Sequence, residues 1–145
     1  MSLLRWRSGL LALSTGLLLA GCQGVTPGKS PSVEFVVPIS VKSAYSRAVE
    51  QSKYCLVTYD RFPLTATLAP DEQSASVRVN MNLTGTLLSD VQIRAQGPSQ
   101  SQVTVTMWGV DVWDATAVAA MRAAIEFGVP SCTNYFPSPD PKKKR

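Results

Sequence analysis

Hydrophobic and polar residues alternate in four segments between residues 64 and 107. In the clearest of them, Val77, Val79 and Met81 alternate with polar residues within residues 76–82. Alternation with a period of two is typical of a β-strand that has one face in the core and the other in water. The other three segments are residues 64–68, 91–96 and 102–107. This clean alternation favours an antiparallel sheet with one covered face.

Two further strands are expected closer to the N-terminus. Residues 33–37 alternate in the same way, and Pro38 marks the end of the strand because proline cannot donate to a β-ladder. A second strand is expected at residues 54–59, with Cys55 near its start. The sheet should therefore contain about four to six strands.

The segment 41–53 has helical spacing instead. Its apolar residues recur three and four positions apart and form one face of a helix, while its charged residues point away from that face. Ser40 precedes the segment and is suited to cap the helix, because a serine hydroxyl can accept a bond from an unpaired amide of the first turn. The segment therefore predicts an amphipathic helix.

A second helix is predicted for residues 112–127, which are rich in alanine. Asp111 or Asp114 can cap its start, and Gly128 stands where helices often end in a left-handed residue. Each helix has one apolar face to bury. We therefore expect residues 33–132 to form a single α+β domain, with an antiparallel sheet and two helices packed on one of its faces.

The first residues of the chain have a different pattern. Two arginines precede an apolar stretch of about ten residues, which is typical of a secretory signal and short for a transmembrane helix. The stretch ends in Leu19-Ala20-Gly21-Cys22, which resembles the bacterial lipobox at all four positions. The alternatives are an ordinary signal peptide followed by a chance cysteine, and an uncleaved anchor.

The resemblance to bacterial lipoproteins implies a signal peptide at residues 1–21 that is removed, and fatty acylation of Cys22. Several acyl chains on one residue bind a membrane essentially permanently, whereas one chain binds only marginally. The next residue is Gln23 rather than the aspartate that favours retention in the inner membrane. The resemblance therefore favours the outer membrane of the bacterial cell envelope, with the domain facing the periplasm.

The two ends of the mature chain lack apolar periodicity. Residues 22–32 are rich in Gly, Pro and Ser, so we expect the acylated cysteine to be followed by a flexible linker that spans at most about 35 Å. Residues 133–145 are rich in Pro and Lys and are expected to be a disordered basic tail. Such a tail is usually only solvated, although its terminal cations could contact anionic envelope polymers.

Two cysteines remain once Cys22 is assigned to the lipid. In an oxidising compartment Cys55 and Cys132 are expected to form a disulfide bond, and the alternative is a pair of buried thiols. The chain contains no histidine, which removes the most frequent general base and metal ligand. Its few neighbouring carboxylates are better explained as turns and helix caps than as an acid/base pair. We therefore expect no enzymatic activity, no metal site and no cofactor.

The net charge of +4 comes from the two ends of the chain. Residues 22–141 carry eight basic and ten acidic side chains, so this part has a net charge of −2 and no nucleic-acid footprint. Aromatic residues in so small a domain are more often core than surface, but Trp108 and Trp113 flank the start of the last helix and are the better candidates for a partner surface.

The sequence leaves three function classes open. The first is a non-enzymatic binding or assembly accessory that presents its polar sheet face or the region around Trp108 to an envelope protein. The second is a structural envelope element that contacts anionic polymers through its basic tail. The third, a small hydrolase, is disfavoured by the missing histidine.

Overall fold

The structure, a computed structural model, describes residues 23–58 and 61–132. The lipobox with Cys22, Asp60 and residues 133–145 lie outside the described residues. Five strands and two helices form the domain: β1 (Ser32–Val37), α1 (Val41–Cys55), β2 (Leu64–Leu68), β3 (Ser74–Asn80), β4 (Leu87–Gly97), β5 (Gln100–Met107) and α2 (Ala115–Phe127).

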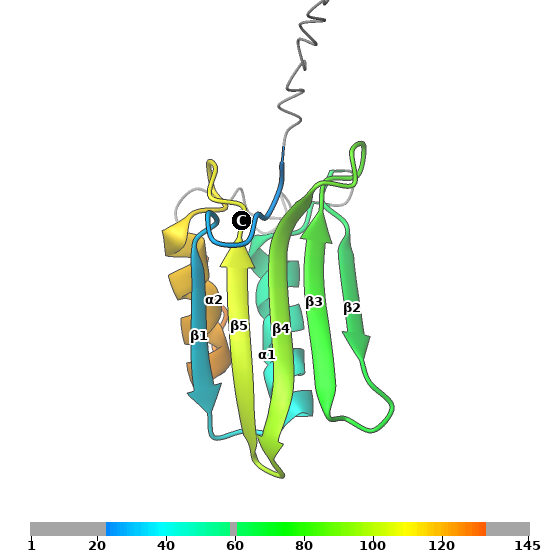
Figure 1. Ribbon diagram of the computed structural model, residues 1–145, viewed down its shortest axis with the longest axis vertical. Coiled ribbons are helices and arrows are strands. Elements are labelled where there is room, and N and C mark those ends of the chain that lie inside the picture. Colours follow the sequence, from blue (N-terminus) through cyan, green and yellow to red (C-terminus); the bar gives the residue numbers. More distant parts are fainter. Residues whose placement is uncertain (1–22, 59–60, 133–145) are drawn as a thin grey trace, which may run out of the picture.

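The strands form one sheet in the order β1-β5-β4-β3-β2, and every neighbouring pair is antiparallel. Both helices lie on the same face of this sheet, behind the strands in Figure 1. α1 packs across β2, β3 and β4, and α2 packs across β1 and β5. The predicted α+β fold, with an antiparallel sheet and two helices on one face, is therefore confirmed.

The core lies between the sheet and the helices, and cross-strand rows of apolar side chains form its floor. One row runs across all five strands through directly paired residues: Val33, Val105, Val91, Val77 and Ala66. The three valines of the central strands are at most 1% exposed. The alternation seen in the sequence therefore places its apolar residues on the face that the helices cover, as expected for a period of two.

The helix caps follow the sequence closely. Ser40 caps α1 by accepting a hydrogen bond from the amide of Ser43, and Asp114 caps α2 by accepting from the amides of Thr116 and Ala117. α2 begins three residues later than predicted, because residues 110–113 form a turn, closed by a bond from the Trp113 amide to the Val110 carbonyl. At the other end, Gly128 adopts the left-handed conformation, with φ 73°.

One of the predicted strands is wrong. Of residues 54–58, which the structure describes, Tyr54 and Cys55 continue α1, and Thr58 makes only an isolated bridge with Phe62. The reason is tertiary packing: Ser52 and Cys55 are buried against the core on the helical face, and burial of that face outweighs local strand preference. α1 is thereby extended by one half-turn beyond its predicted end at residue 53.

Candidate functional site

Residues 23–31 lie against the end of the sheet at which β1 begins. The indole Nε1 of Trp108 donates a hydrogen bond of 2.6 Å to the Gln23 carbonyl, and the amide of Val25 donates one of 2.8 Å to the Leu87 carbonyl. The hydroxyl of Ser30 donates to the Trp108 carbonyl at 3.1 Å. The segment is therefore held to the start of β4 and the end of β5, where its composition predicted a flexible linker.

A tight turn explains why so polar a segment has a defined course. The amide of Lys29 donates to the Thr26 carbonyl at 3.2 Å, with Pro27 and Gly28 between them. Proline sets the backbone angle required at the first central position of a β-turn, and Gly28, with φ 74°, meets the positive φ required at the second in a type II turn. The Ser30 hydroxyl also accepts from the amide of Thr26 at 2.8 Å, which closes the loop.

Gly24 allows this segment to approach β4 closely. A Cβ atom at this position would lie 2.3 Å from the Leu87 carbonyl oxygen and 2.7 Å from Cγ2 of Thr86. Both distances are too short for a real side chain, and the first involves backbone that cannot move aside cheaply. Any residue other than glycine would therefore push the N-terminal segment away from the sheet.

The two tryptophans proposed as a partner surface have different environments. Trp113 is only 3% exposed and packs edge-to-face on Phe62, with ring centroids 5.6 Å apart, so it belongs to the core and its predicted exposure is wrong. Trp108 is partly buried, and its indole N–H binds Gln23 of its own chain. Both tryptophans therefore make contacts within the domain. Trp113 packs in the core, and Trp108 binds the N-terminal segment.

A shallow, open hollow separates the N-terminal segment from the β5–α2 connection. Its lining includes Gln23, Lys29, Trp108, Val110 and Asp114. The carboxylate of Asp114 is already bound to two amides of α2. The hollow thus offers one cation and an open surface, and no convergent set of groups that would bind a small molecule.

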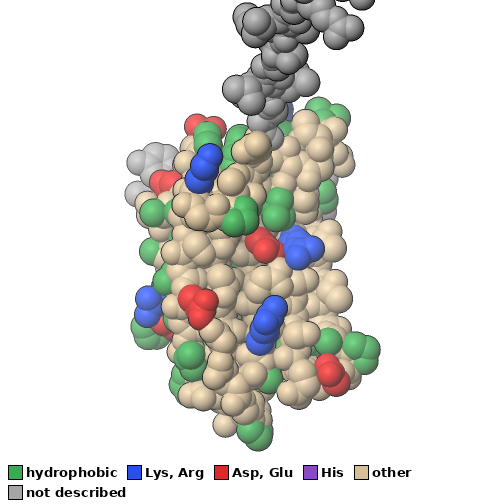
Figure 2. All heavy atoms as spheres, viewed as in Figure 1, with side chains coloured by type: hydrophobic (Ala, Val, Ile, Leu, Met, Phe, Trp, Pro, Cys, Tyr) green, Lys and Arg blue, Asp and Glu red, His purple; other side chains and the backbone are tan. Residues whose placement is uncertain are grey.

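The face of the sheet opposite the helices is polar throughout its centre. Directly paired side chains form cross-strand rows there, one of them Glu34, Thr104, Gln92, Ser76 and Thr67. Figure 2 shows this face, on which a few acidic and basic side chains, some of them adjacent, stand in a mainly polar surface. This face presents hydrogen-bonding side chains from all five strands.

Many of these polar groups are already paired with one another. Arg78 Nε donates to Asp90 Oδ1 at 3.0 Å, and the side-chain Nε2 of Gln92 donates to the same oxygen at 2.7 Å. The hydroxyl groups of Ser32 and Thr106 lie 2.8 Å apart. The face is therefore stable in water without a partner, and its hydroxyl and amide side chains can each take part in more than one hydrogen bond.

The predicted disulfide bond joins Cys55, at the end of α1, to Cys132. Their Cα atoms are 5.2 Å apart, within the range usual for disulfides. The side-chain amide of Gln51 supports the same junction: it donates to the Ser131 carbonyl at 2.8 Å and accepts from the Ser131 amide at 2.9 Å. The chain after α2 is thus fixed along α1 by one covalent bond and two hydrogen bonds.

The neighbouring carboxylates have structural partners. Asp71 accepts from the amide of Gln73 within the β2–β3 turn, and Glu72 forms an ion pair of 2.9 Å with Lys42 of α1. Asp114 caps α2, as described above. Among the described residues, no group of three or more cysteines and carboxylates is arranged to hold a metal ion.

Comparisons with known proteins add no family to this description. No protein-family model matches the chain, and no curated protein matches it in sequence. Within residues 23–58 and 61–132, no helix has both the length and the apolar character needed to cross a membrane. The function must therefore be argued from the residues and their geometry.

Proposed function

We propose that this protein is an outer-membrane lipoprotein, anchored through fatty acids on Cys22, whose domain stands at the periplasmic surface of the bilayer as a non-enzymatic binding or assembly accessory. The lipobox Leu19-Ala20-Gly21-Cys22 supports the anchor. The disulfide between Cys55 and Cys132 is consistent with an exported protein, because such bonds persist in oxidising compartments.

The hydrogen bond between Trp108 and Gln23 is the observation that supports a fixed position of the domain close to the membrane. Gln23 directly follows Cys22, and consecutive Cα atoms are about 3.8 Å apart. With Gln23 held at 2.6 Å by the indole, no free spacer separates the acylated residue from the domain. The end of the sheet at which β1 starts would therefore rest at the membrane, with the strands leading away from it.

The open polar face is the surface that we assign to a protein partner. The apolar face of the sheet is covered by both helices, and the indole N–H of Trp108 is bound to its own chain. The open face offers hydroxyl, amide and charged side chains from five strands. Interfaces of non-obligate complexes are about as polar as ordinary protein surface, so such a face is suited to reversible binding.

Fatty-acid labelling in growing cells tests the anchor. A palmitate analogue should label the wild-type protein, and Cys22→Ser should abolish both labelling and removal of residues 1–21. The double variant Cys55→Ser/Cys132→Ser is the matched control, because it removes the other two cysteines and should still be labelled. Labelling that survives in Cys22→Ser would show that the anchor has been assigned to the wrong residue.

Site-specific photocrosslinking in intact cells tests the partner surface. A photoreactive residue in place of Arg94 or Thr104 reports on the open face, and one in place of Ser46 reports on the exposed side of α1. A single protein adduct from the first two positions and none from the third would support the assignment. Adducts only from Ser46, or from none of the three, would contradict it.

A further inference from the structure

We propose that the anchored end of the domain is itself a membrane-binding surface, and that Leu83 and Val110 insert into the lipid layer beside the acyl chains of Cys22. This inference rests on the proposed lipid anchor and extends it. Instead of a single flexible attachment, the protein would contact the bilayer at three points, which would set the orientation of the sheet.

Leu83 is the most exposed large hydrophobic residue in the described part of the chain, at 96%. It lies at the tip of the β3–β4 connection, whose shape is fixed by short backbone bonds. The Met81 amide donates to the Thr86 carbonyl at 2.8 Å, and the Asn82 amide donates to the Arg61 carbonyl at 2.8 Å. Because the base of this connection is held on both sides, the leucine side chain projects away from the domain.

Val110 is 44% exposed and lies in the β5–α2 connection. Two backbone bonds to Trp113 close the loop. The Gly109 amide donates to the Trp113 carbonyl at 2.7 Å, and the Trp113 amide donates to the Val110 carbonyl at 3.1 Å. The Trp113 side chain is buried beneath the loop. A rigid, buried base thus holds Val110 at the surface.

The topology brings both connections to the end of the sheet against which the N-terminal segment lies. β3 and β5 are each antiparallel to β4, so they run in the same direction and finish at the same end of the sheet. β1 begins at that end, because it is antiparallel to β5. Figure 1 shows the first described residues of the chain, in blue, between these two connections. The bond from Trp108 ties Gln23 to the Val110 loop, and the bond between Val25 and Leu87 ties the segment to β4 just after the Leu83 turn.

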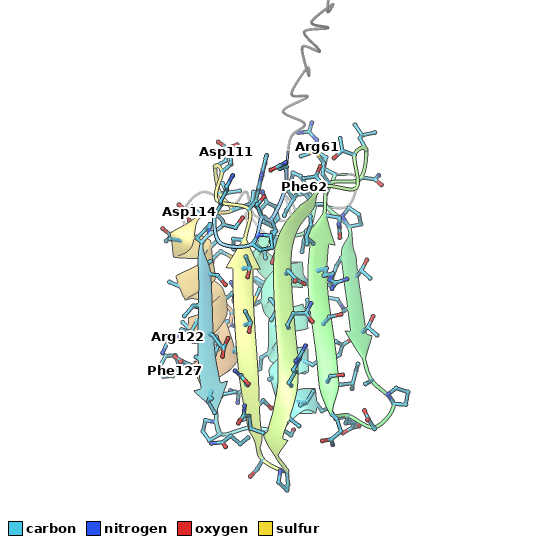
Figure 3. All side chains as sticks on the ribbon, viewed as in Figure 1. Arg61, Phe62, Asp111, Asp114, Arg122 and Phe127 are labelled. Atoms are coloured by element: carbon cyan, nitrogen blue, oxygen red, sulfur yellow. A yellow bond between two sulfur atoms is a disulfide. The ribbon has the colours of Figure 1, made fainter. Side chains whose placement is uncertain are left out.

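Among residues 23–58 and 61–132, the charged side chains placed at this end are balanced. Figure 3 shows Arg61 and Asp111 there, with Asp114 close by at the start of α2, and Lys29 lies in the adjoining turn. Two basic side chains and two carboxylates of the described residues therefore lie at this end, and one of the carboxylates is occupied as the α2 cap. Apolar side chains on an uncharged or cationic rim are what binding to the interface of an anionic bilayer requires.

Exposed apolar residues elsewhere serve as a comparison. Phe127 is 75% exposed and lies at the opposite end of α2 from the anchored end. Because a single exposed apolar side chain is ordinary on a protein surface, exposure alone would not mark Leu83. What marks it is its position at the end from which Cys22 must emerge, together with a second apolar tip on the neighbouring connection.

Photocrosslinking to lipid tests the inference on the full-length, membrane-bound protein. A photoreactive residue replaces Leu83, Val110 or, as the control, Phe127, and adducts are analysed by mass spectrometry. All three positions are exposed in the domain, so the replacements leave the core intact. We expect phospholipid adducts at positions 83 and 110 and none at position 127.

The same samples separate the two proposals. If the proteins carry fatty acids on Cys22 but positions 83 and 110 give no lipid adduct, or give mainly protein adducts, the membrane-binding surface is refuted while the anchor stands. Lipid adducts of equal yield at all three positions would also refute it, because they would mean an unoriented domain. If Cys22 itself carries no fatty acid, the proposed function fails first and the inference fails with it.

Discussion

The indole N–H of Trp108 donates a hydrogen bond of 2.6 Å to the backbone carbonyl of Gln23, the residue that follows Cys22. This bond joins the end of β5 to the first described residue of the chain across 85 positions of sequence. It makes the N-terminal segment part of the domain, and it fixes Gln23 at the end of the sheet where β1 begins.

Replacing Trp108 with Phe removes the N–H donor and keeps an aromatic ring. We expect the free energy of unfolding to fall by about 0.5–1.5 kcal/mol, the net value of a typical hydrogen bond, because water can partly replace the donor at this half-buried site. Urea denaturation measures the loss, and hydrogen exchange should be faster at the Val25 amide than in the wild type. Unchanged exchange at Val25 would mean that the bond does not hold the segment.

Gly24→Ala should release the same segment by a different route. The added Cβ would meet the Leu87 carbonyl oxygen at 2.3 Å, so the segment must move, at a cost of roughly 1–3 kcal/mol. Gly97→Ala is the matched control, because an added Cβ there meets no atom within 4 Å. Thermal unfolding should show a lower midpoint for Gly24→Ala and little change for Gly97→Ala. Equal behaviour of the two variants would count against the close packing of residue 24.

Removing the disulfide bond with Cys55→Ser/Cys132→Ser should lower the free energy of unfolding by about 2–4 kcal/mol. The bonded cysteines are 77 positions apart, for which chain entropy alone predicts about 4–5 kcal/mol, and measured effects are usually smaller. The two hydrogen bonds between Gln51 and Ser131 remain, so the native fold should persist. Wild-type protein unfolded with and without reductant provides the check, and alkylation of both thiols in the unreduced protein would contradict a native disulfide.

Asp114→Ala should destabilise the domain by about 1 kcal/mol, because two amides in the first turn of α2 lose their acceptor. Asp111→Asn is the control from the same loop, since Asp111 lies outside the helix, is exposed and has a φ of 52°, which asparagine tolerates. Its effect should stay within about 0.5 kcal/mol, as is usual for surface substitutions. Chemical denaturation of both variants gives the comparison, and equal losses would mean that the cap contributes no more than a loop residue.

The sheet and the helices could be predicted from the sequence because their signals are local. The alternation in residues 76–82 and 102–107 required no knowledge of the partner strands, and Ser40 and Asp114 cap the helices as their side-chain chemistry indicates. The extension of α1 through Cys55 could not be predicted in this way. It depends on the core that buries Ser52 and Cys55, which only the folded chain supplies.

The docked N-terminal segment was missed because its composition resembles that of a linker. A signal was nevertheless present: the dipeptide Pro27-Gly28 is typical of a turn, with Thr26 before it and Ser30 after it to close the loop. The partner of Gln23 could not be found from sequence, because Trp108 lies 85 positions away and its ring could equally have been buried or exposed. Long-range pairing of this kind requires the tertiary structure.

The central claim is that Cys22 is the acylated first residue of a domain that rests on the membrane. Mass spectrometry of the mature protein, purified from the outer-membrane fraction, tests it most directly. The claim predicts an N-terminal peptide that begins at Cys22 and carries a diacylglyceryl group on sulfur and a fatty acid on the amine. An N-terminus at any other residue, or an unmodified Cys22 in the membrane-bound protein, would contradict it.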